Sequence, residues 1–349
     1  MEPTSKAKLF IHIGQTKTGS TTLQAFMHAN REALKWRGLL YPGTPGKPST
    51  LKHRFLIESV HRASEGSGAA EAAWSFLAEQ IDRQRAPINV VSEEEFWHLF
   101  EERPSRRRTA IQWIAQRLEA YDVRVVCYLR RQSDWVESWF NQIVKTDVTP
   151  SAKLSFEEFI ARQSKLGLMD YQKVLGDWSE VFGADHIIVR PWERERLLRG
   201  DIVDDFCALV GLQDTQDLKR PDNQQSRLSA PALEAMLAFN RQSGAAAYKG
   251  EFIKAILEEP GYQADDRRSV LTSERAAEID ARHAETNRQV ARTFCGTDEL
   301  FGPPSPEGRL AYAGLTSNEL IDMAARLFIV QQRTIDALSA RLDKLEAGR

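Results

Sequence analysis

The strongest constraint on the fold of this chain is a polar, glycine-containing loop between an apolar run and a helical pattern near its N-terminus. The apolar run is Leu9 to Ile13, and the pattern that follows places Leu23, Phe26 and Met27 on one helical face. Residues 14–22 form the loop and the helix start between them. Such a turn aims several backbone N–H groups and the positive end of a helix at one point, which suits phosphate or sulfate. The sequence therefore predicts a strand, loop and helix that bind a nucleotide.

Three further apolar runs each end in polar or charged residues. They are Ile88 to Val91, Val123 to Leu129, and His186 to Val189. Short strands that alternate with helical stretches are typical of a parallel sheet, whose ligands lie beyond the carboxyl ends of the strands. We expect an α/β fold of three layers, P-loop-like, with a central and mostly parallel sheet flanked by helices. We assign residues 1–310 to one catalytic domain and residues 315–349 to a C-terminal helix.

Charge and cysteine usage exclude several classes of protein. Among 349 residues, 47 are Lys or Arg and 49 are Asp or Glu, so no overall positive field attracts nucleic acid or a membrane surface. Cys127, Cys207 and Cys295 lie far apart without metal-ligand or disulfide spacing. Met1 to Lys8 is polar, with no signal-peptide pattern, and no apolar run is long enough to span a membrane. We predict a soluble, cytoplasmic protein without a metal site.

The C-terminal tail has a heptad pattern. Apolar or small residues recur every seven positions, with Gln331 as a polar member, in two series: Ile321, Phe328, Ile335, Leu342, and Ala324, Gln331, Leu338, Leu345. A coiled coil that joins copies of the chain fits this pattern. A terminal helix that lies against its own domain fits it equally well.

The phosphate loop differs from that of kinases and ATPases. In the pattern G-x-x-x-x-G-K-[ST] a lysine follows the second glycine, but here Ser20 follows Gly19, and the lysine is Lys17. A nucleotide kinase or NTPase with an atypical loop is one alternative function. A non-catalytic assembly module that acts through the C-terminal helix is another, and a polar turn with a solvated lysine would have no function at this loop.

The segment from Lys17 to Gln24, after Phe10 to Gly14, resembles the 5′-phosphosulfate loop of sulfotransferases that use 3′-phosphoadenosine 5′-phosphosulfate (PAPS), most closely their carbohydrate and bacterial branch. The resemblance implies that Lys17 reaches the oxygen between the sulfuryl group and the phosphate. It also implies that the 5′-phosphate is held by Thr18, Gly19, Ser20, Thr21 and Thr22.

A second anion site is predicted after the strand that ends at Leu129. Arg130 follows that strand, and Ser138 comes eight residues later. Asp134 and Glu137 have capping-box spacing, which predicts a helix that begins at Trp135 with Ser138 in its first turn. A guanidinium offers paired donors to an oxyanion. The arrangement resembles the family's 3′-phosphate motif, which implies that Arg130 and Ser138 bind the 3′-phosphate of PAPS.

A base is needed to take a proton from the hydroxyl or amine acceptor, and transfer itself is an in-line displacement governed by positioning and charge. Related carbohydrate sulfotransferases use a glutamate after the next strand, where this chain has Glu93 and Glu94. These two are the candidate bases, and His12 is a third. The resemblance implies a glycan or another small hydroxylated molecule as acceptor.

Overall fold

The computed structural model describes most of the chain, in two compact units. The described residues are 6–47, 49–66, 70–221, 227–257, 268–304 and 309–347. Residues 1–135, 162–224 and 279–304 belong to the first unit, and residues 136–161, 225–278 and 305–349 to the second. The assignment of residues 1–310 to a single catalytic domain stays a prediction.

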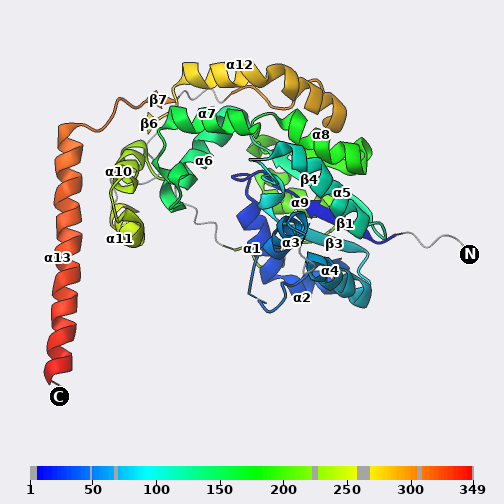
Figure 1. Cartoon of the computed structure of the whole chain (residues 1–349), viewed down its shortest axis with the longest axis horizontal. Helices are drawn as coiled ribbons and strands as arrows, with labels where there is room; N and C mark the ends of the chain where they lie inside the picture. The colour runs from blue at the N-terminus through cyan, green and yellow to red at the C-terminus, as the bar shows by residue number, and fades with distance from the viewer. Residues whose placement is uncertain are drawn as a thin grey trace, which may run out of the picture. The chain divides into compact units, whose positions relative to one another are not determined.

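The first unit is built around a parallel sheet of five strands (Figure 1). The order is β2, β3, β1, β4, β5, and every neighbouring pair is parallel. The strands are β1 (Lys8–His12), β2 (Leu39–Leu40), β3 (Ile88–Ser92), β4 (Asp122–Leu129) and β5 (Ile187–Pro191). The α/β fold with a central parallel sheet is therefore confirmed, and the carboxyl ends of the predicted strands share one edge.

Both faces of the sheet are buried. On one face, Phe10, Val90, Val126 and Tyr128 form a core with side chains of the flanking helices, such as Phe206. Successive side chains of a strand point to opposite faces. The alternate residues are equally apolar and buried, so a second helical layer is needed to cover the opposite face. This double burial explains why the strands read as continuous apolar runs in the sequence.

Helices supply both layers of the first unit (Figure 1). α1 and α9 contact each other, as do α1 and α2, whereas α3, α4, α5 and α8 form a separate set of contacts. Their bounds are α1 (Ser20–Ala29), α2 (Arg31–Trp36), α3 (Arg54–Ser64), α4 (Glu71–Gln84), α5 (Arg107–Arg117), α8 (Tyr171–Phe182) and α9 (Ile202–Leu209).

The second unit is mainly helical. It contains α10 (Ala230–Asn240), α11 (Ala245–Leu257), the short parallel pair β6 (Arg268–Ser269) and β7 (Leu310–Ala311), and α13 (Ser317–Ala347). Three helices contribute residues to both units: α6 (Gln132–Thr146), α7 (Phe156–Leu166) and α12 (Ser273–Val290). The C-terminal helix predicted for residues 315–349 is present as α13. None of the described helices is long and apolar enough to cross a membrane.

Candidate functional site

The loop that follows β1 has the geometry of an anion-binding turn. Lys17 lies at φ 68° and Gly19 at φ 81°, so two of its residues occupy the left-handed region. Gly19 precedes the first residue of α1, and no side chain caps the helix there. The first amides of a helix have no acceptor within it, and they point with the positive end of the helix dipole out of the helix start. The loop thus presents backbone donors, as a phosphate or sulfate requires.

Two glycines of this loop stand where a larger residue does not fit. A Cβ atom on Gly19 would lie 3.2 Å from Cγ2 of Ile202 and 3.3 Å from Nε1 of Trp192. On Gly14 it would lie 2.8 Å from Oγ of Ser20. The loop is therefore packed closely between its own helix and the segment after β5, which fixes the direction of its amides.

The structure brings Arg130 to the loop, although the two are more than a hundred residues apart. Oε1 of Gln15 accepts a hydrogen bond from the Arg130 amide at 2.9 Å, and Arg130 Nη1 donates to the Lys17 carbonyl at 3.4 Å. The Tyr171 hydroxyl donates to the Arg130 carbonyl at 2.6 Å, and the guanidinium carbon lies 5.0 Å from the ring centre of Trp192. These contacts hold Arg130 beside the loop. A single site that binds two anionic groups would require a cationic side chain in such a position.

The start of α6 differs from the prediction. The helix begins at Gln132, not at Trp135, and Asp134 lies inside its first turn. The cap comes from Asp280, which accepts from the amide and the hydroxyl of Ser133 at 3.1 and 2.9 Å. Because Asp280 is distant in sequence, the local pattern of Asp134 and Glu137 gave the wrong start.

Ser138 is consequently the seventh residue of α6, and its amide lies where amides bond to the helix itself. Only its hydroxyl is available for a ligand. It belongs to the second unit and is half-buried. Its predicted contact with the 3′-phosphate stays a prediction.

The two candidate glutamates lie in different environments. Glu94 forms an ion pair with Lys52, with 2.5 Å between Oε2 and Nζ. Glu93 is 1% exposed, its amide donates to the His12 carbonyl at 3.1 Å, and its Oε2 has no hydrogen-bond partner among the described residues. Burial raises the pKa of Glu93 to about 7, against a smaller lowering by Lys52. A carboxyl group whose pKa is close to neutrality can both take and release a proton.

His12, the third candidate base, is fully buried, and burial lowers its pKa to about 4. Its Nδ1 lies 2.7 Å from Oγ of Ser92, and that oxygen accepts from Nε2 of Gln24 at 3.1 Å. A hydroxyl can accept two hydrogen bonds and donate one, so this contact suits either neutral tautomer of His12. The ring connects β1, β3 and α1 as a neutral group, so it is poorly suited to be the base.

Polar atoms without partners gather around the loop. Among the described residues, Oγ of Ser20, Nε2 of His12, Nε1 of Trp192 and Oε2 of Glu93 are buried and make no hydrogen bond. The first three adjoin the loop glycines: a Cβ atom on Gly14 would lie within 3.1 Å of Ser20 Oγ and His12 Nε2, and one on Gly19 near Trp192 Nε1. Buried polar groups in folded proteins are normally paired, so this concentration indicates a place for a polar ligand.

The remaining predicted loop residues have distinct roles. The Thr18 hydroxyl is engaged within the loop, where it donates to the Gln15 carbonyl at 2.6 Å. Only the amide of Thr18 is left for a ligand. Thr21 and Thr22 are half-buried in the first turn of α1. No three His, Cys, Asp or Glu side chains cluster as metal ligands would within the described part of the chain.

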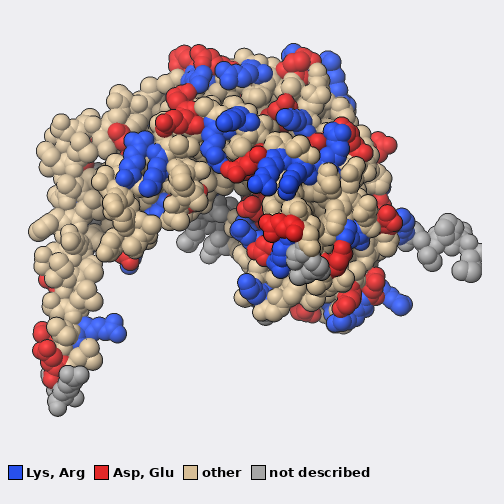
Figure 2. All heavy atoms as spheres, in the orientation of Figure 1, with Lys and Arg blue, Asp and Glu red and all other residues tan. Residues whose placement is uncertain are grey.

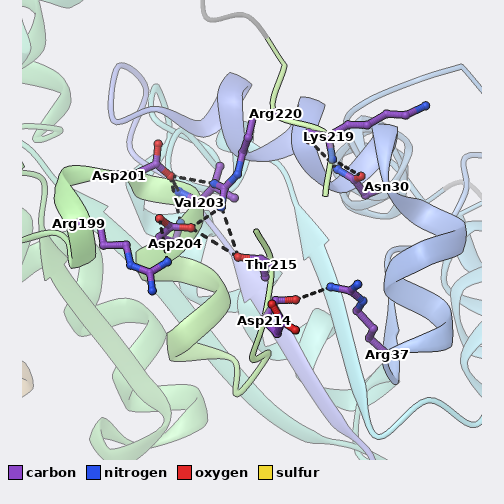
Figure 3. A network of polar contacts seen from close by, with 10 residues as sticks. All are labelled: Asn30, Arg37, Arg199, Asp201, Val203, Asp204, Asp214, Thr215, Lys219 and Arg220. Carbon is purple, nitrogen blue, oxygen red and sulfur yellow. Dashed lines mark hydrogen bonds and ion pairs between the residues drawn. The ribbon is translucent and has the colours of Figure 1, made fainter. Parts of the chain in front are cut away.

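Ion pairs and hydrogen bonds join the segment after α9 to α9 itself and to α1, the helix that follows the loop (Figure 3). Arg220 pairs with Asp201, at 3.2 Å, and with Asp204 at the start of α9. Asn30, at the end of α1, exchanges two hydrogen bonds of 2.9 Å with the backbone of Lys219. The network holds α9, and with it Ile202, against the loop.

Several residues of the site could not be identified from the sequence. Gln15, Ser92, Tyr171 and Trp192 contribute through contacts between distant segments. Trp192 and Ser92 had one usable signal, since each lies at the carboxyl end of a predicted strand. Gln15 lies within the predicted loop, but nothing in the sequence indicated its contact with Arg130, and Tyr171 had no signal.

Comparisons with known proteins give limited similarity. No protein-family model matches the chain. An uncharacterized protein of Archaeoglobus fulgidus is 25% identical over 179 residues, which cover 51% of this chain and 47% of that protein. The chain thus spans about half the length of this curated relative. Among solved structures, a sulfotransferase from Alicyclobacillus acidocaldarius is similar to 73% of this chain and covers 97% of its own, with 18% identity and a TM-score of 0.40. The fold and site themselves define an α/β protein with a glycine-containing loop between β1 and α1.

Proposed function

We propose that this protein is a sulfotransferase that uses PAPS as sulfuryl donor. The observation that carries the proposal is the convergence of Arg130 on a phosphate-type loop surrounded by buried polar atoms without partners. A donor with anionic groups at both its 5′ and 3′ positions needs two cationic or amide-rich contacts in one site. The sequence resemblance of the loop and of Arg130 to the PAPS-binding motifs supports the same assignment.

In this proposal the loop holds the 5′ side of the donor. The amides from Thr18 to Thr22 and the Ser20 hydroxyl donate to its oxygens, and Lys17 offsets the charge that develops on the phosphate. Arg130 binds the 3′-phosphate, with Ser138 as its partner on sequence grounds. PAPS supplies the sulfuryl group, whose bond to the phosphate oxygen breaks as its bond to the acceptor oxygen or nitrogen forms.

Glu93 is proposed as the base that takes the acceptor's proton. Its free Oε2, its burial and its pKa near neutrality support this choice over Glu94, whose carboxylate is paired with Lys52. The acceptor is proposed to be a sugar hydroxyl or another small alcohol or amine. Screening glycans, lipids, alcohols and amines with labelled PAPS identifies it.

Nucleotide selectivity tests the proposal. Calorimetry on the full chain should show binding of adenosine 3′,5′-bisphosphate without magnesium and weak binding of ATP. The reason is that Arg130 is proposed to bind a 3′-phosphate, which ATP lacks. Magnesium-dependent ATP binding with hydrolysis would instead assign the chain to the kinases or NTPases.

Lys17→Ala extends this test to the loop. We expect it to remove sulfate transfer from labelled PAPS, with an unchanged circular dichroism spectrum, because the substitution deletes a charge and leaves the glycines in place. Lys35→Ala, on the exposed side of α2, is the matched control and should keep full activity. Equal activity of both variants would remove Lys17 from the mechanism.

A further inference from the structure

α13 carries a long apolar stripe that its own unit leaves exposed. Ile321, Phe328, Leu338 and Leu345 are exposed by 61 to 68%, and Ile335 and Leu342 by about half. These residues occupy the two heptad series of the sequence. Single exposed apolar residues are ordinary, but a row of this length on one helix marks an interaction surface.

Only the first turns of α13 are fixed to the second unit. Glu319 accepts from the Thr316 amide at 2.9 Å and pairs with Arg268 at 2.7 Å, and Met323 is buried. From Gln331 to Glu346 every residue is exposed. The two alternatives for the C-terminal helix, a coiled coil and a helix that lies against its own domain, both stay predictions.

A helix that projects in this way needs a partner. Most helical stability in proteins comes from packing of the apolar face and not from the intrinsic propensity of the residues. Figure 2 shows few charged side chains over most of the viewed side of α13, and these gather near its C-terminal end.

We propose that α13 pairs with α13 of a second copy of this chain in a parallel two-stranded coiled coil. With Ile321 in the first heptad position (a), the fourth positions (d) include Gln331 as the polar residue of the exposed seam. A single polar seam residue fixes the register of two identical helices.

The flanking charges support a parallel pair of identical helices. Arg341 falls in the seventh heptad position (g), and Glu346 in the fifth position (e) of the next heptad. In a parallel dimer these two positions face each other across the interface, so two Arg341–Glu346 contacts form by symmetry. Asp322, Asp336 and Asp343 occupy the second heptad position (b), with Ile329 between the first two.

Sedimentation velocity on the full chain tests the pairing. The unmodified protein should be a dimer. Combined Ile335→Lys and Leu342→Lys should raise the dissociation constant by about a hundredfold or more, because two seam layers then bury charge. Ala340→Lys, on the outer face of the same helix, is the control and should leave the dimer intact.

Cysteine cross-linking tests the orientation. Gln331→Cys should give a disulfide-linked dimer under mild oxidation because equivalent d positions meet in a parallel pair, whereas Ala340→Cys should not. Any of three results would overturn the proposal. The unmodified protein could be a monomer, the seam and control variants could dissociate equally, or the dimer could fail to cross-link at residue 331. The inference does not depend on sulfotransferase activity.

Discussion

The run of three glutamates after β3 illustrates how neighbouring residues of one type acquire different chemistry. Glu93 continues the pairing of β1 with β3 through its amide, which draws its side chain into the protein. Glu94, one residue later, begins a short 3₁₀ turn and reaches Lys52. Strand pairing therefore decides which carboxyl group is desolvated, and desolvation raises its pKa.

Glu93→Gln should lower sulfate transfer by about a hundredfold or more, because general base catalysis contributes on this order. In the unmodified protein the rate should rise with pH around a midpoint near 7, as Glu93 loses its proton. The variant should lack this rise. The pH–rate profiles of the two proteins with labelled PAPS provide the measurement.

The pH dependence of protein stability also reports on the protonation of Glu93. The pKa of Glu93 is raised from 4.5 to about 7 on folding, so its stabilising effect is complete below pH 4.5 and is lost as pH rises through 7. Thermal melts should therefore show a smaller loss of stability between pH 5 and 8 in Glu93→Gln than in the unmodified protein. Glu32→Gln, on the exposed side of α2, should follow the unmodified protein in both assays. A Glu93→Gln variant with the full pH-dependent rise in rate would refute the assignment.

Among the helices, α6 shows how a distant residue determines an element's start. Asp280→Ala removes the acceptor of the Ser133 amide and hydroxyl, and the loss of a helix cap costs about 1 to 2 kcal/mol. We expect the free energy of unfolding of the full chain, measured in urea, to fall by this amount.

The matched control for the cap is Asp298→Ala. Asp298 is highly exposed and pairs with Arg292, so its removal should change stability by less than about 0.5 kcal/mol. Equal effects of the two substitutions would show that Asp280 does not stabilise the start of α6.

The sequence predicts elements well where one local signal determines them. The four long strands are continuous apolar runs, because both faces of the sheet are covered, and all four are present. β2 was missed, since Leu39 and Leu40 are too few to form a pattern. The start of α6 was wrong because its cap is contributed by α12.

The residues of the candidate site also differ in how far the sequence predicts them. The positions of the loop and of Arg130 at the sheet edge could be predicted, because each directly follows a strand, whereas their roles stay predictions. The contacts of Gln15, Tyr171 and Trp192, and the difference between Glu93 and Glu94, depend on packing between distant segments. No local pattern in the sequence encodes them.

At the scale of the whole molecule, the proposed chemistry and the proposed assembly draw on different residues. Lys17, Glu93 and Arg130 belong to the first unit, whereas the exposed stripe lies on α13 of the second. The distal half of α13 contributes nothing to the core, since every residue from Gln331 to Glu346 is exposed. Removing that half should therefore leave both units folded.

A chain that ends at Val330 keeps the anchoring contacts of Glu319 and the buried Met323, but loses most of the seam. We expect it to be monomeric by sedimentation velocity and to bind adenosine 3′,5′-bisphosphate within about twofold of the full chain, because its loop and Arg130 are intact. Calorimetry on both chains at equal concentration makes the comparison. If the shortened chain is monomeric and its affinity falls tenfold or more, pairing of α13 also shapes the nucleotide site, and assembly and catalysis are coupled. If it stays dimeric, the interface lies outside the distal half of α13.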